Sequence, residues 1–329
     1  MSSTKKTLYH VIILLLSASM LGGMGLYVYK NSSSFDRIQN IDISVILLLI
    51  GMHACNYFLL GLTQTYPLQR HNINLKFKEW YGLCTLADLL NYILPASGGS
   101  AARLLFINKK YDLSKRELVS MGLAMSMPGF ILLGVVGAVY CHFLLSKHAV
   151  IFTALETMFI ILTVVSLAFL FASNFIMKIF KMDRKYSPNK YLTDKKLMTV
   201  STLSWLGMML LHPLKVYLSF KAIGIEIKAF DSFEISLILL ASSFFQVLPG
   251  NIGVKEMVTA YIAQQYGIQF ETALLASLVD RAILMLFLFP MGAYSYWSLV
   301  MDASLPKINW PKMGASSRIP LMKRLVKVR

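Results

Sequence analysis

The chain has 329 residues, of which 56% are hydrophobic and only 15% charged, whereas soluble domains average about 45–50% apolar and about 25% charged residues. Apolar runs of bilayer-spanning length, about 20 residues, recur along the chain, which predicts an all-α polytopic membrane protein and excludes a transmembrane β-barrel with its short alternating strands. The net charge of +16 comes without a nucleic-acid recognition motif, so we interpret it as a topology signal and as affinity for anionic lipid headgroups, with no nucleic-acid partner.

Nine apolar runs follow one another, and we expect them to form one integral membrane domain over residues 1–329. They are Leu8–Tyr29, Ile43–Gln64, Tyr81–Ile107, Leu118–Leu145, Thr157–Met177, Leu197–Phe220, Ile235–Val254, Met257–Gly267 and Ala282–Met301. The first run is longer than the core of a signal peptide, which is usually about 7–15 residues. We therefore favour an uncleaved first crossing over a signal peptide.

Two segments are interrupted by proline followed by glycines. The interrupting residues are Pro95, Gly98 and Gly99 in the first segment and Pro249, Gly250 and Gly253 in the second. Proline removes a backbone donor, and glycine releases the chain from helical geometry. Each segment is therefore predicted to form two half-helices around a break. A kinked full crossing is the alternative, because membrane helices tolerate both residue types.

The distribution of basic residues favours re-entrant hairpins over full crossings. If both broken segments return to their own side, 23 of the 32 Lys and Arg residues lie on the side of the N-terminus and only five on the other. Positive residues concentrate on the cytoplasmic side of membrane proteins. We therefore predict about six full crossings and two re-entrant hairpins in the plasma (inner) membrane, with both termini in the cytoplasm.

This topology contains an internal repeat. Leu94-Pro95 and Gly99 recur 154 residues later as Leu248-Pro249 and Gly253, and both copies have the order crossing, broken hairpin, crossing. The predicted parts are repeat one at about 41–145, a linking helix at about 150–177, repeat two at about 197–301 and a basic cytoplasmic tail at 302–329. The odd linking helix inverts the second copy, and inverted repeats with broken helices are typical of transporters.

Charged residues inside the apolar runs are the candidate site. They are the cations Arg103, Lys215, Lys255 and Arg281 and the acids Asp88, Glu256 and Asp280. A charge at the bilayer centre costs at least about 2.5–3.5 kcal/mol, so these residues must face a cavity, a partner or a pathway.

Arg103 and Lys255 each follow a break, at the start of a half-helix where the backbone already favours an anion such as phosphate. We therefore interpret the four cations as ligands of a lipid phosphate, and the three acids as charge or proton partners. Internal ion pairs among the same residues are the open alternative. Asn91, before the first break, is expected to bond backbone groups that the break leaves without partners.

Catalytic machinery is not evident in the sequence. The chain has no nucleophile–base pair, no metal-ligand spacing of Cys or His, and no nucleotide-binding loop. We expect no catalytic residue, no metal and no cofactor, and enzymatic activity stays an uncertain alternative to transport.

The two broken motifs resemble those of the membrane-domain family of lysyl-phosphatidylglycerol synthases. The resemblance rests on Asn91, Leu94, Pro95, Gly99 and Arg103, on Leu248-Pro249-Gly250 with Gly253-Val254-Lys255-Glu256, and on Arg281. Lys255 stands where the family often has Arg. No aminoacyl-transfer domain follows the last apolar run, so the resemblance implies a stand-alone member.

The resemblance implies a flippase-like transporter that moves an anionic lipid or a lipid-linked intermediate, such as a polyprenyl-phosphate-linked sugar, between leaflets. The alternative is a membrane enzyme or accessory factor in lipid-linked glycan or aminoacyl-lipid biosynthesis. In either case a lipid-modifying transferase is a candidate partner.

Overall fold

The computed structural model describes residues 41–94, 97–144, 149–179, 187–243 and 248–300, and these ranges contain helices and no strand. The elements are α2 (Ile43–Thr65), η2 (Tyr66–His71), α3 (Phe77–Ile93), α4 (Gly98–Tyr111), α5 (Lys115–Leu144), α6 (Ala149–Ile179), α7 (Asn189–Leu192), α8 (Lys195–Ala222), α9 (Ala229–Ser242), η4 (Pro249–Asn251), α10 (Val254–Gln264) and α11 (Phe270–Val300). The predicted all-α membrane fold is confirmed.

Five of the described helical stretches are long and apolar enough to cross a membrane, namely α2 with η2, α5, α6, α8 and α11. They coincide with five of the six predicted crossings. The remaining one, Leu8–Tyr29, lies outside the described residues. The last crossing is longer than the apolar run Ala282–Met301, because α11 begins at Phe270 and continues as a helix through two charged residues that line the cavity.

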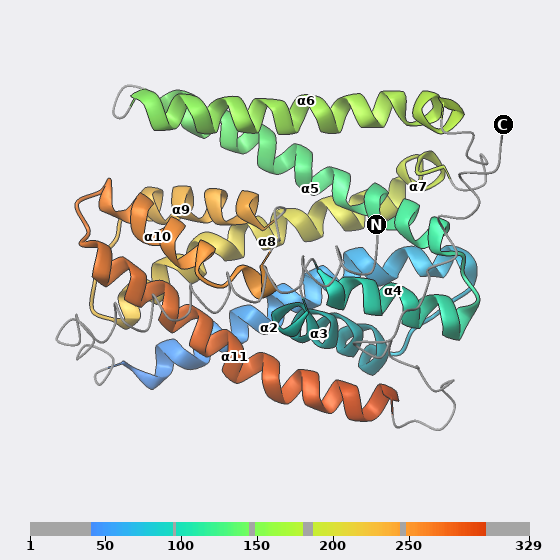
Figure 1. The fold of residues 1–329 in the computed structure, drawn as a ribbon, viewed down its shortest axis with the longest axis horizontal. Helices are drawn as coiled ribbons and strands as arrows, with labels where there is room; N and C mark the ends of the chain where they lie inside the picture. The colour runs from blue at the N-terminus through green and yellow to red at the C-terminus, as the bar shows by residue number, and fades with distance from the viewer. Residues whose placement is uncertain (1–40, 95–96, 145–148, 180–186, 244–247, 301–329) are drawn as a thin grey trace, which may run out of the picture.

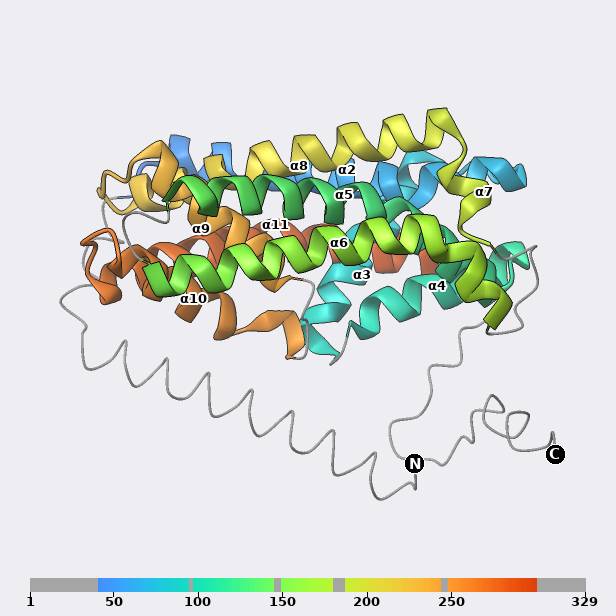
Figure 2. The same ribbon diagram turned by 90° about the horizontal axis from the view of Figure 1, so that it is seen from above.

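The two interrupted segments each fold into a pair of shorter helices. α3 packs against α4, and α9 packs against α10. These helices have 11–17 residues, or about 16–26 Å at 1.5 Å per residue, which is less than the roughly 30 Å of a hydrocarbon core. The two pairs approach the middle of the bundle from opposite ends (Figures 1 and 2).

The order of a long helix, a helix pair and a second long helix occurs twice, first as α2, α3–α4 and α5, then as α8, α9–α10 and α11. The packing is reciprocal: α2 contacts α11 as α8 contacts α5, and α3 contacts α11 as α9 contacts α5. α6 lies between the two sets in sequence and packs along α5, where Gly137 accommodates the ring of Phe159.

The outer surface of the bundle carries large apolar side chains. Leu47, Val164, Val165, Leu210 and Phe289 are each more than half exposed. An apolar surface of this extent is unusual for a soluble monomer and suits contact with lipid chains.

One end of the bundle gathers most of the basic residues of the described loops. They are Arg70, Lys76, Lys78, Lys109, Lys110, Lys115, Arg116, Lys190, Lys195 and Lys196. Contacts across this end hold the loops together; for example, Arg70 pairs with Asp194 at 2.6 Å, and Lys110 pairs with Glu79 at 2.5 Å. Lys221, in the last turn of α8, and Lys228, which follows this helix, lie towards the opposite end.

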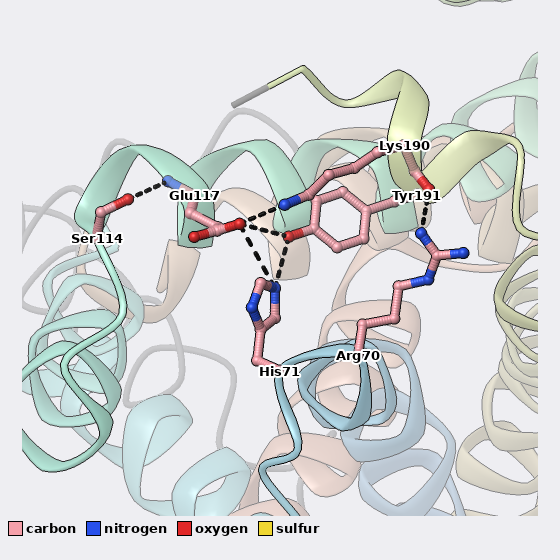
Figure 3. A network of polar contacts seen from close by, with 6 residues as sticks. All are labelled: Arg70, His71, Ser114, Glu117, Lys190 and Tyr191. Atoms are coloured by element: carbon pink, nitrogen blue, oxygen red, sulfur yellow. Dashed lines mark hydrogen bonds and ion pairs between the residues drawn. The ribbon is translucent and has the colours of Figure 1, made fainter. Parts of the chain in front are cut away.

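A buried carboxylate organises the same basic end (Figure 3). Glu117 on α5 accepts hydrogen bonds from Lys190 and from the Tyr191 hydroxyl, and lies 3.6 Å from His71 Nε2. Burial and the nearby Glu117 carboxylate raise the pKa of Tyr191, so its hydroxyl stays protonated and can donate. This network fastens α7 to η2 and to the start of α5.

Candidate functional site

The first break joins α3 to α4 by a short turn. α3 ends at Ile93, Leu94 is extended, and Ser97 is left-handed with a φ of 55°. Pro95, predicted to begin this break, lies outside the described residues. The chain leaves helical geometry and re-enters it within these few positions, so the predicted pair of half-helices is present.

Gly98 and Gly99 do not break the helix, as was expected, but form its first turn. Both belong to α4, so the expectation that they release the chain from helical geometry is wrong. Gly99 instead allows close approach, because a Cβ there would lie 1.8 Å from the carbonyl oxygen of Ala87 on α3. The start of α4 can therefore pack directly on the α3 backbone only with glycine at this position.

Asn91 supplies the cap that α4 lacks from its own sequence. Its Oδ1 accepts the backbone N–H groups of Gly99 at 2.9 Å and of Ser100 at 3.2 Å, and its Nδ2 donates to Asp88 Oδ1 at 3.4 Å. Backbone donors at a helix N-terminus need such partners when they are buried. The expected backbone role of Asn91 is confirmed.

The second break is built on left-handed glycines. Gly250 has a φ of 58° and Gly253 a φ of 87°, as the glycine pattern predicts. Pro249 begins the short η4 turn, which contains Gly250, and Gly253 directly precedes α10. Glu256 then caps α10, because its Oε2 accepts the Gly253 N–H at 2.8 Å.

The two breaks meet in the middle of the bundle. A Cβ on Gly250 would lie 2.3 Å from Cδ1 of Tyr92, which stands just before the first break. Arg281 on α11 joins this contact: its Nη1 donates to the Gly250 carbonyl at 3.2 Å, and its guanidinium lies 5.6 Å from the centre of the Tyr92 ring. Arg281 also forms an ion pair with Glu256, which is only 1% exposed.

A cavity of about 510 Å³ lies beside this junction, and α2, α3, α4, α5, α8, α9, α10 and α11 contribute to its wall. Its lining includes every charged residue of the predicted site, namely Asp88, Arg103, Lys215, Lys255, Glu256, Asp280 and Arg281. Residues from distant parts of the sequence thus surround one space. Of the predicted break residues, Gly250 also lines it.

Three of the four cations in this wall lack a direct ion pair within the described part of the chain. Among the described residues, Arg103, Lys215 and Lys255 form no ion pair within 4.0 Å and no hydrogen bond through their side chains. Lys215 is nevertheless only 6% exposed. A buried cation without a partner is costly, so the arrangement favours an anion in the cavity. Arg281 differs from them, because Glu256 already neutralises it.

The two remaining carboxylates of the wall, Asp280 and Asp88, contact a histidine and neutral polar groups rather than a lysine or an arginine. Asp280 Oδ1 lies 3.2 Å from His53 Nε2, and the Asp280 side chain is 35% exposed towards the cavity. Asp88 accepts hydrogen bonds from the Tyr57 hydroxyl and from Asn91. Neither acid pairs directly with Arg103, Lys215 or Lys255 within the described part of the chain.

Several cavity residues were missed by sequence reasoning. They are His53, Asn56, Tyr57 and Gln64 on α2, Tyr92 on α3 and His212 on α8. The α2 residues Asn56, Tyr57 and Gln64 follow His53 by 3, 4 and 11 positions and therefore share one helix face. A polar stripe of this kind inside an apolar run is the signal that could have found them.

Known proteins allow a family assignment for this arrangement. The family described as the lysylphosphatidylglycerol synthase TM region matches residues 11–292. No curated protein and no solved structure matches the chain. The family match includes both breaks and all seven charged residues of the cavity wall. The chain therefore belongs to the family of the lysylphosphatidylglycerol synthase transmembrane region.

Proposed function

We propose that the protein is a flippase-like transporter that moves an anionic lipid, or an intermediate linked to a polyprenyl phosphate, between the leaflets of the plasma membrane. The observation that supports this most is a set of three cations, Arg103, Lys215 and Lys255, around one cavity inside a membrane-embedded bundle. None of the three forms a direct ion pair with a described residue. A phosphate is the anion that such a lipid would bring into this space.

Side chains, rather than helix ends, carry this binding in the proposal. The first N–H groups of α4 are bonded to Asn91, and the Gly253 N–H at the start of α10 is bonded to Glu256. These bonds occupy the Gly99, Ser100 and Gly253 N–H groups, and both helix N-termini still contribute partial positive charge. The lipid phosphate is therefore held by Arg103 and Lys255, with Lys215 as the third cation.

The two helix pairs supply the moving parts of this proposal. We assign α3–α4 and α9–α10 as re-entrant hairpins of two inverted repeats, with both chain termini in the cytoplasm. The cavity then lies at the junction of the repeats, where alternating-access transporters bind their substrates. Movement of one hairpin relative to the other would open the cavity to each leaflet in turn.

Purified protein in liposomes with a fluorescent phosphatidylglycerol tests this function. A membrane-impermeant quencher reports how much labelled lipid reaches the other leaflet. We expect Arg103→Gln, Lys215→Met and Lys255→Gln to lose translocation while keeping the wild-type elution profile and thermal stability. Lys221→Gln is the matched control, because Lys221 is an exposed cation at the end of α8, away from the cavity.

The outcome also decides between transport and the alternative role in lipid-linked glycan or aminoacyl-lipid biosynthesis. Stable cavity variants that translocate lipid at the wild-type rate would refute the phosphate site. Conversion of a lipid to a new product without translocation would instead favour an enzyme or an accessory factor for a transferase.

A further inference from the structure

The cavity has an apolar arm in addition to its charged centre. Leu104 and Ile107 of α4 line it from one side, and Leu118, Met121 and Met125 of α5 line it from another. Except for Leu104, these side chains are buried. A water-soluble anion would leave the apolar side chains of this arm uncovered, whereas a hydrocarbon chain attached to the bound phosphate would pack against them.

Gly122 forms the rim where this arm meets the outer surface of the bundle. It lines the cavity and is exposed, and a Cβ built on it would find no atom within 4 Å. On one side of it along the helix circumference lie the buried Leu118 and Met125. On the other side lies Val119, which is 49% exposed on the lipid-facing surface.

The described helices leave this rim uncovered. α6 packs on α5 near Gly134 and Gly137, and diverges from it towards the N-terminal end of α5 (Figure 1). Ser126, one turn beyond Gly122 on the cavity wall, donates its hydroxyl to the Gly122 carbonyl at 2.9 Å. The polar atom is thus satisfied within the helix, and the rim suits an apolar chain.

The depth of Gly122 places the rim inside one leaflet. Gly122 is seven residues from Lys115, or about 10 Å along α5 at 1.5 Å per residue. Lys115 belongs to the basic end of the bundle, which is the cytoplasmic end in the proposed orientation. The rim therefore faces the acyl chains of the inner leaflet rather than the headgroups or water.

We propose that the opening beside Gly122, between α4 and α5, is the lateral portal through which the hydrocarbon chain of the transported lipid stays in the inner leaflet while its phosphate binds at Arg103. This inference rests on the proposed lipid transport and adds the route by which the lipid reaches the cavity. The substrate class is then a lipid whose chain is too long to be enclosed with its phosphate in about 510 Å³.

Tryptophan at position 122 tests the portal against a matched control. Gly51 on α2 is also an exposed helical glycine with no atom within 4 Å of a built Cβ, but it does not line the cavity. We expect Gly122→Trp to lower translocation of fluorescent phosphatidylglycerol to the rate of protein-free liposomes. Gly51→Trp should translocate at the wild-type rate, and both variants should keep wild-type thermal stability.

The same assay separates failure of the portal from failure of the transport function. Wild-type translocation by Gly122→Trp, with Arg103→Gln inactive, would overturn the portal and leave the transport function standing. Wild-type translocation by both Gly122→Trp and Arg103→Gln would overturn the portal and the phosphate site together. Translocation by the wild-type protein no faster than in protein-free liposomes would overturn the transport function itself.

Photo-crosslinking identifies what lies at the rim. We expect benzoylphenylalanine incorporated at position 122 to give a phosphatidylglycerol adduct in liposomes, detected by mass spectrometry. The same residue at position 51 should give lipid adducts that Arg103→Gln does not change, whereas Arg103→Gln should reduce the adduct at position 122. An adduct at position 122 to a peptide of this chain, in place of lipid, would overturn the portal.

Discussion

Tyr92 lies directly against the backbone of Gly250, so the two broken segments of the chain touch at their breaks. A Cβ on Gly250 would come within 2.3 Å of the Tyr92 ring. Arg281 holds the same junction from the side by bonding the Gly250 carbonyl. The wall of the cavity therefore depends on contacts between residues that are far apart in sequence, and substitutions here should affect stability and transport together.

The contact between the breaks can be measured with two glycines of similar conformation. Gly250 and Gly224 have φ of 58° and 72°, but Gly224 has no atom within 4 Å of a built Cβ. Alanine at either position should cost about 1–2 kcal/mol for the left-handed backbone. Gly250→Ala should cost about 1–3 kcal/mol more because it overpacks against Tyr92. Thermal or denaturant unfolding in detergent gives both values.

A second substitution checks that the extra cost comes from this contact. In a Tyr92→Ala background, Gly250→Ala should destabilise no more than Gly224→Ala does. An equal extra cost with and without the Tyr92 ring would contradict the contact as its cause.

The ion pair between Glu256 and Arg281 should be a stability element. Glu256 is almost fully buried and also caps α10, so Arg281→Met should cost about 3–5 kcal/mol by leaving the carboxylate unpaired. The double variant Arg281→Met with Glu256→Leu should cost less than the sum of the two single variants, as unfolding measurements in detergent would show.

Lys110→Met is the control for this pair. Lys110 pairs with Glu79 between the outer ends of α4 and α3, and both side chains are more than 20% exposed. Its removal should cost no more than about 1 kcal/mol. Comparable losses of stability for Lys110→Met and Arg281→Met would contradict the stabilising role of the buried ion pair between Glu256 and Arg281.

Much of the fold was predictable because its signals are local. The apolar runs predicted the positions of five described crossings, and the proline and glycine residues predicted where both helices are broken. The partners of the buried charges were not predictable, since Glu256 could pair with Lys255, Arg281 or a ligand on sequence grounds. Only the packing of α10 on α11 selects Arg281.

The role of a residue in the folded protein can also differ from the role that its neighbours in the sequence suggest. Gly99 follows a proline and reads as a helix breaker, yet it is helical and is needed for contact with the α3 backbone. Similarly, His53 reads as an isolated residue of an apolar run, and becomes a site residue only when α11 brings Asp280 to 3.2 Å. Such roles follow from tertiary packing, which single-sequence patterns do not specify.

The proposed orientation predicts which loops an impermeant thiol reagent can reach. In a background without the three native cysteines, Lys115→Cys should be protected in intact cells and Gln269→Cys should be labelled. Both positions are exposed, whereas Leu113 in the same loop is only 8% exposed and would label poorly on either side. External labelling of Lys115→Cys would refute the re-entrant assignment of α3–α4, provided that the cells are shown to be intact.

The last prediction concerns Asp194, which caps α8 and pairs with Arg70 at the basic end. Burial acts to raise the pKa of Asp194, but the Leu197 N–H and Arg70 outweigh it and hold the pKa below its usual value of 3.8. Stabilisation by a carboxylate with a lowered pKa is present above the unfolded-state pKa and is lost as the pH falls through the folded-state value. Asparagine keeps the cap and removes only the charge.

Asp194→Asn should therefore lower the stability in detergent by up to about 1 kcal/mol at neutral pH. This difference from the wild type should shrink as the pH falls below about 4, where the wild-type carboxylate is protonated. Asp42→Asn is the matched control, because Asp42 caps α2 through the Ser44 N–H but has no basic partner among the described residues. It should show little effect at neutral pH. A loss in Asp194→Asn that persists unchanged at low pH would assign the effect to the cap or to packing, and not to the charge pair with Arg70.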